Sequence, residues 1–94
     1  MALARVVSFE GVSAERMAEM RREIEQGERP ADVPASEFLM LHDPEGERAL
    51  AIVFFDTDED YARGDAALDA MPAAETPGRR AVVEKYEVTA RMTT

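Results

Sequence analysis

Apolar positions change their spacing several times along the chain, and each change predicts a secondary-structure element. Residues 3–9 are rich in β-branched and aromatic side chains and end at a glycine turn, which predicts a strand. Behind Ser13, a favourable N-cap, apolar residues recur at three- and four-residue spacings with charges between them. This pattern predicts an amphipathic helix that ends at Gly27. A loop over residues 27–36 follows, with two prolines and no periodicity, and a connection of this length is often functional.

Residues 37–42 and 48–55 predict a β-hairpin around the turn sequence DPEGE. Both segments are apolar at nearly every position, so both faces of this hairpin are expected to be covered. Thr57 can cap a second helix, which Pro72 ends. The apolar stripe of this helix comprises Tyr61, Gly64, Leu68 and Met71. Alternation in residues 81–91 predicts a final strand.

The order β-α-β-β-α-β predicts a single ferredoxin-like α+β domain over residues 1–94, with a four-stranded antiparallel sheet and two helices on one face. The hairpin is apolar on both sides, so the sheet face without helices also needs cover. A domain of this size hides only about 60–65% of its surface on folding, and a second copy supplies further apolar cover. We therefore predict a homodimer that packs through its sheet faces by two-fold symmetry.

Composition narrows the partners and the compartment. Hydrophobic residues make up 46% and charged residues 33%, which is typical of a folded domain. The net charge of −9 disfavours nucleic acid and anionic membranes as partners. The chain has no cysteine, no signal-like segment and no apolar run long enough for a membrane span, so we expect a cytoplasmic protein. No phosphate-binding glycine loop, calcium loop or zinc motif occurs, so no cofactor and no metal are expected.

The segments ARVVSFEG, EFLMLHDPEGERALAIVFFDTDEDYARGDAAL and VVEKYEV, arranged around a helix and a long loop, resemble the dimeric α+β barrel superfamily, and within it the small antibiotic-biosynthesis-monooxygenase-like proteins. The resemblance covers nearly the whole chain and rests on features of the fold. It implies a homodimer whose two sheets form a barrel, with room for a ligand between sheet and helices. Haem-degrading members present their ligand on a helix, whereas the one histidine of this chain ends the second predicted strand, and the chain has no tryptophan.

His42 is the first candidate site residue, because a lone imidazole can give and take protons near neutral pH. If the hairpin pairs Leu41 with Ala49, His42 shares a face with Leu50 and Ile52 and lies at the rim of that apolar face. The alternative, which we favour, is a histidine beside a turn that is half exposed or hydrogen-bonded to a neighbouring acid.

Three further side chains are candidates for ligand contact. Tyr61 and Tyr86 could each present a phenol to a cavity between helix and sheet, although core packing with the hydroxyl at the edge is favoured. Arg5 falls in a strand expected at the centre of the sheet, where a buried guanidinium needs a carboxylate partner. An ion pair with Glu84 or Glu87 on the last strand is favoured over an anion-binding role.

Two functions remain open on the sequence. The first is a non-catalytic dimeric module that binds a small apolar or aromatic molecule or serves as an assembly unit. The alternative is a cofactor-independent monooxygenase-like enzyme acting on an aromatic or polyketide-like molecule, with His42, Tyr61 and Tyr86 as its polar groups. An enzyme of this kind must gather at least two of these groups around one enclosed space. The shortage of polar residues on the predicted inner faces favours the first function.

Overall fold

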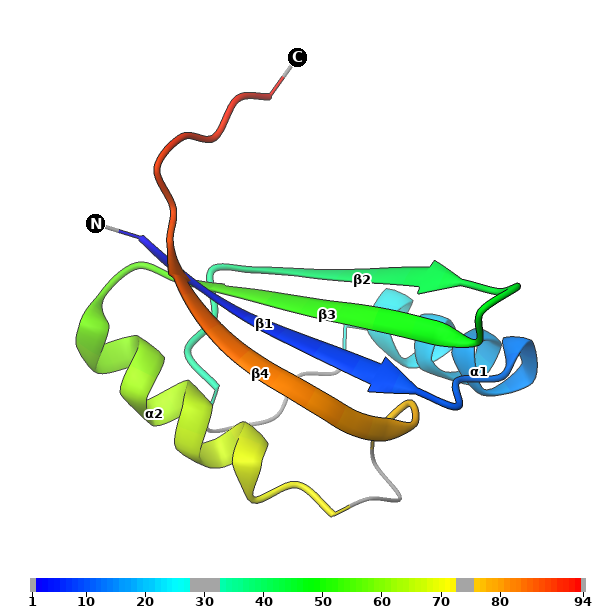
Figure 1. Ribbon diagram of the computed structural model, residues 1–94. Coiled ribbons are helices and arrows are strands. Elements are labelled where there is room, and N and C mark those ends of the chain that lie inside the picture. Colours follow the sequence, from blue (N-terminus) through cyan, green and yellow to red (C-terminus); the bar gives the residue numbers. More distant parts are fainter. Residues whose placement is uncertain (1, 28–32, 73–75, 94) are drawn as a thin grey trace.

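The computed structural model describes residues 2–27, 33–72 and 76–93 and confirms the ferredoxin-like α+β prediction (Figure 1). The elements follow in the predicted order: β1 (Leu3–Glu10), α1 (Ala14–Glu25), β2 (Glu37–Asp43), β3 (Arg48–Phe55), α2 (Asp58–Asp69) and β4 (Arg79–Glu87). The strands form one sheet in the order β2-β3-β1-β4, and each neighbouring pair is antiparallel. The first strand is therefore central, as the sequence predicts.

The register of the strands divides the side chains between two faces. Arg5 pairs with Val53 on one side and with Lys85 on the other, and these three side chains face the helices. Val6, one residue later, pairs with Ile52 and Glu84, and these side chains face away from the helices. Because successive residues of a strand alternate between faces, the same division holds along the sheet.

The core on the helix side falls into two clusters, one under each helix. The first comprises Val7, Phe9, Val12, Ala49 and Ala51, with Met17 of α1 and Met40 of β2 packed against it. The second comprises Leu3, Val53, Phe55 and Tyr61, with Val33, Ala35 and Leu68 packed against it. No residue of α1 is buried, and Met17 of this helix packs against the first cluster, whereas α2 buries Tyr61 and Gly64.

Both helices begin at the predicted caps. The Ser13 hydroxyl accepts a hydrogen bond from the backbone N–H of Arg16 at 3.1 Å, and the Thr57 hydroxyl accepts one from Asp60 at 3.0 Å. Val12, fully buried, precedes the cap of α1 and packs in the same cluster as Met17 one turn into the helix. This contact is a hydrophobic staple, which sets the angle at which the chain enters the helix.

Gly64 allows α2 to lie directly on the sheet. A Cβ atom at this position would lie 2.3 Å from Cε1 and 2.4 Å from Cζ of Phe55, far inside van der Waals contact. The ring of Phe55 therefore occupies the space that a side chain at Gly64 would need. Tyr61, one turn earlier, packs edge-on against the same ring, with 5.5 Å between the ring centroids.

The last strand differs from the prediction at both ends. It begins at Arg79, two residues earlier than predicted, and ends at Glu87, four residues before the predicted end. The reason is the length of its neighbour: Leu3, the first residue of β1, pairs with Glu87, and beyond it Val88 donates a single further hydrogen bond to the carbonyl of Ala2. Of the predicted loop 27–36, residues 28–32 lie outside the described residues, so the prediction of a functional loop is not tested.

Candidate functional site

His42 lies on the helix side of the sheet, not on the face predicted from the sequence. The hairpin pairs Leu41 with Leu50 and His42 with Ala49, one position away from the assumed register. A slip of one residue moves every side chain of a strand to the other face. The prediction that His42 shares a face with Leu50 and Ile52 is therefore wrong, because two-sided apolar strands contain no alternation from which to read the register.

In this position His42 holds the hairpin to the start of α1. Its Nε2 atom lies 3.3 Å from the carbonyl oxygen of Val12, and because a carbonyl can only accept, Nε2–H is the donor. This partner replaces the expected acid beside the turn. A shallow open groove of about 470 Å³ runs between His42 and α1. Its lining comprises Ala14, Met17, Ala18, Arg21, Arg22, Glu25, His42 and Pro44.

The turn beside His42 is held by Asp43. One carboxylate oxygen accepts from the backbone N–H of Gly46 at 3.2 Å, and the other accepts from the Arg48 guanidinium at 2.7 Å. The bond from Arg48, followed by the bond from Gly46, lowers the pKa of Asp43 below its ordinary value. Asp43 thus forms hydrogen bonds with Arg48 and Gly46, whereas the His42 ring lies on the side of α1 and bonds to Val12.

Tyr61 is a core residue of α2. It is 7% exposed, its ring packs against Phe55, and the Lys85 ammonium lies 4.7 Å from the ring centroid in cation–π contact. Burial, and after it the negative charge of Asp65, raises the pKa of the Tyr61 phenol above its ordinary value. Tyr61 therefore keeps its proton at neutral pH and serves the packing between helix and sheet.

Arg5 is buried, as predicted, but its partners lie on α2. Arg5 is 4% exposed; its Nε donates to Asp65 at 2.8 Å and one terminal nitrogen donates to Asp69 at 3.2 Å. Asp69 also accepts from Arg80 at 2.8 Å. The predicted pairing with Glu84 or Glu87 is wrong: Glu84 points to the opposite face, and α2 places two carboxylates directly over the guanidinium. The donors of Arg5 toward these acids are thus used within the fold.

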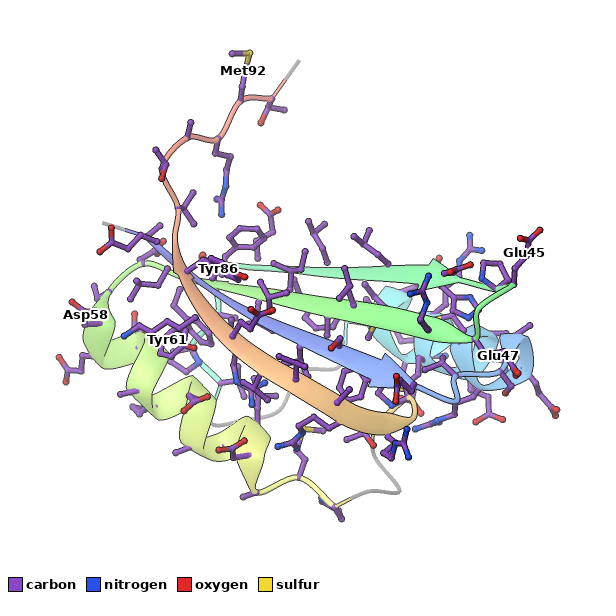
Figure 2. All side chains as sticks on the ribbon, in the orientation of Figure 1. Glu45, Glu47, Asp58, Tyr61, Tyr86 and Met92 are labelled. Carbon is purple, nitrogen blue, oxygen red and sulfur yellow. The ribbon has the colours of Figure 1, made fainter. Side chains whose placement is uncertain are left out.

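Tyr86 is half exposed on the face opposite to Tyr61, and Figure 2 shows the two residues on β4 and α2 respectively. Tyr86 pairs with Ala4 of β1, and its hydroxyl donates a 2.9 Å hydrogen bond to Glu84 two residues earlier on the same strand. This hydrogen bond, followed by the negative charge of Glu84, raises the pKa of Tyr86 above its ordinary value. The two tyrosines therefore do not line one space within a single copy of the chain.

Several exposed apolar side chains gather on the sheet face that carries no helix, here called the open face. By register its side chains are Ala4, Val6 and Ser8 of β1, Leu39 and Leu41 of β2, Leu50, Ile52 and Phe54 of β3, and Val82, Glu84 and Tyr86 of β4. Leu39, Leu41, Leu50, Val82 and Tyr86 are each between 38% and 50% exposed. Apolar side chains thus cross all four strands on a surface that is uncovered in the single chain.

Opposite charges border the open face at both ends. At the hairpin end, one residue of each strand aligns in a row of alternating sign, formed by Asp43, Arg48, Glu10 and Arg79. Asp43 binds Arg48, and Glu10 binds Arg79. At the other end the Arg91 guanidinium lies 4.2 Å from the ring centroid of Phe54 and 3.7 Å from Glu37.

The chain leaves the sheet on the side of the open face. Residues 88–93 follow β4 and rise away from the sheet, and Met92, near the end, is 86% exposed (Figures 1 and 2). Both helices lie on the opposite side, where Met17 and Tyr61 enter the two core clusters. Arg91 of this segment contacts the margin of the open face, while Leu39, Leu41, Leu50 and Val82 stay exposed.

The four predicted site residues are dispersed. His42 is at the α1 groove, Tyr61 and Arg5 are under α2, and Tyr86 is on the open face. Of these, Tyr61 and Arg5 lie near one another, in a region already filled by the ion pairs and by Phe55. The hydrophobic pattern of the sequence predicts an apolar sheet face without helices. Which residues point to that face depends on the strand register, which the sequence leaves open.

The chain matches no protein-family model and no curated protein. Within the described ranges, neither helix is long and apolar enough to cross a membrane.

Proposed function

We propose that this protein is a non-catalytic homodimeric module whose two copies pack face to face through the open face. The observation that carries the proposal is the set of half-exposed apolar side chains on β2, β3 and β4, which Ala4 and Val6 of β1 connect across the sheet. Soluble proteins rarely expose an apolar patch of this extent unless it is an interaction site. A second copy fits because the patch is largely apolar and is bordered by charges of both signs, so the same surface of another copy can complement it about a two-fold axis.

The dimensions of the sheet suit a specific interface near the lower limit of size. β1 and β3 are each eight residues long, and the sheet has four strands. With strands about 4.8 Å apart and about 3.3 Å per residue, the flat footprint is on the order of 500 Å² per copy. Two copies therefore bury about 1,000 Å² in total, without the extra area that side chains projecting from the sheet would add. This area reaches the size expected of a biological interface.

Charge also favours this face over other surfaces of the molecule. Each copy carries a net charge of −9, so two copies repel at most orientations. On the open face, Asp43, Glu10 and Glu37 each have an arginine partner within the same chain. Contact through this face consequently brings together charges that are largely balanced within each copy.

The dispersal of the polar candidates supports a module without catalysis. An enzyme that acts on an aromatic molecule needs at least two polar groups around one enclosed space. Here His42 is hydrogen-bonded to the backbone at an open groove, Arg5 is engaged by Asp65 and Asp69, and Tyr86 bonds Glu84. For the monooxygenase-like alternative, the described residues of one copy therefore supply no such constellation.

The proposal is tested by placing a charge at the centre of the open face. Ile52 lies between Val6 and Leu39 in the register, so Ile52→Glu would bring two carboxylates into an apolar contact. We expect wild type to be a dimer at micromolar concentration in light scattering, and the variant to be a monomer. Leu39→Glu, on the edge strand where folding is less affected, is expected to act in the same direction.

Ile24→Glu is the matched control. Ile24 is 38% exposed on α1, away from the open face, so the same added charge should leave the dimer intact. Circular dichroism establishes that each variant is folded. A wild-type monomer at micromolar concentration, or a folded Ile52→Glu or Leu39→Glu variant that remains dimeric, would contradict the proposal.

A further inference from the structure

The open face contains one carboxylate that differs from the others. Asp43, Glu10 and Glu37 each contact an arginine of the same chain. Glu84 instead accepts a hydrogen bond from the neutral hydroxyl of Tyr86 at 2.9 Å. Among the described carboxylates of this face, Glu84 is therefore the one without an arginine partner.

Glu84 lies on the edge strand β4, between two apolar side chains that point to the same face. Val82 and Tyr86, two residues to either side on β4, point to the same face and are 48% and 50% exposed. Val6 of the central strand is its cross-strand neighbour. A second copy that covers both Val82 and Tyr86 also covers the position between them, so association reduces the contact of Glu84 with water.

Among residues 2–27, 33–72 and 76–93, no cation forms an ion pair with Glu84. Lys85, its neighbour in sequence, points to the helix side, where it contacts the Tyr61 ring and lies 3.9 Å from Asp58. The arginines of the open face stand at its ends, and each is occupied: Arg48 by Asp43, Arg79 by Glu10, and Arg91 by Glu37 and Phe54. β1 offers Ala4, Val6 and Ser8 on this face, none of which is charged.

We infer that association of two copies through the open face is coupled to protonation of Glu84, so that the dimer is tighter at mildly acidic pH. The inference rests on the proposed function. A buried carboxylate without a cation costs several times more when ionised than when neutral, and the neutral carboxyl can still bond the Tyr86 hydroxyl. The dimer therefore takes up protons as it forms, and by linkage its stability falls as pH rises.

The test measures the dimer dissociation constant of the full chain by sedimentation at pH 5.5, 6.5 and 7.5. A water-exposed glutamate is almost fully ionised between pH 5.5 and 7.5. Proton uptake by a glutamate in this pH range therefore means that its surroundings change when two copies associate. For wild type we expect the dissociation constant to rise at least about tenfold from pH 5.5 to 7.5. Glu84→Gln should bind at least about tenfold more tightly than wild type at pH 7.5 and lose most of the pH dependence.

Glu87→Gln is the matched control, because Glu87 lies on the same strand, is exposed and points to the helix side. It removes the same charge from the chain, so it reports how much of the effect arises from general repulsion between acidic copies. We expect it to keep the wild-type pH dependence.

The outcomes separate the inference from the proposal beneath it. A dimer that Ile52→Glu dissociates, but whose affinity is independent of pH, overturns the inference and leaves the homodimer standing. Weaker association of Glu84→Gln than of wild type also overturns it, since that result means that the ionised carboxylate meets a cation of the second copy. Absence of a dimer at every pH refutes the proposed function itself.

Discussion

Replacement of Gly64 by alanine tests whether α2 lies on the sheet as closely as the structure indicates. The added Cβ would stand 2.3 Å from Cε1 and 2.4 Å from Cζ of Phe55. Ordinary contact between carbon atoms begins near 3.4 Å, so helix and ring must separate by about 1 Å. Phe55 is fully buried and its ring is also packed against Tyr61, so the ring has little room to retreat.

Two opposing contributions set the size of the effect. Alanine is a better helix former than glycine by about 0.8–1 kcal/mol, which alone would stabilise the protein. Overpacking a close-packed core costs about 1–3 kcal/mol, and the upper part of that range applies where neighbours are fixed. The expected net loss is about 1–2 kcal/mol, equivalent to a fall in Tm of roughly 4–16 °C for a domain of this size.

Thermal unfolding at one fixed protein concentration measures the change, because dimerisation makes Tm depend on concentration. Phe55→Leu in the Gly64→Ala background makes space for the methyl group, so the double variant should be more stable than the sum of the two single losses predicts. Ala66→Gly, at an exposed position of α2, isolates the helix propensity. If Gly64→Ala is as stable as wild type, or more stable, the close approach of α2 to Phe55 is refuted.

Two further predictions concern buried polar groups. In urea unfolding, Arg5→Met should lower the free energy of unfolding less than the double variant Asp65→Ala/Asp69→Ala does. The first change leaves two carboxylates that reach water, whereas the second leaves a guanidinium that is 4% exposed, at a cost of up to about 3 kcal/mol. The reverse order would contradict the burial of Arg5. Burial raises the pKa of Tyr61, so above about pH 10 the unfolded chain ionises first and stability falls. Between pH 9 and 11 the Tm of Tyr61→Phe should fall less than the Tm of wild type. The variant still contains Tyr86, so an equal fall would show that Tyr61 is not the group responsible.

The candidate site was less predictable than the fold, and the hairpin shows why. β2 and β3 are apolar on both sides, so shifting the pairing by one residue leaves an equally apolar pattern. In the folded chain Leu41 pairs with Leu50, and this register places His42 at the α1 groove and not on the open face. Likewise, charge spacing alone could not show that α2, rather than β4, supplies the partners of Arg5.

What the sequence determined by itself was the local structure. The caps at Ser13 and Thr57, the turn after Asp43 and the change from strand to helix periodicity act over a few residues, so they can be read along the chain. The order of the elements then selects a ferredoxin-like fold. The tertiary structure decided which side chains share a face, which charges are paired and which apolar surface stays uncovered, because these depend on register and on contacts between residues as far apart in sequence as Arg5 and Asp69. The open face, and the position of Glu84 within it, belong to that second level.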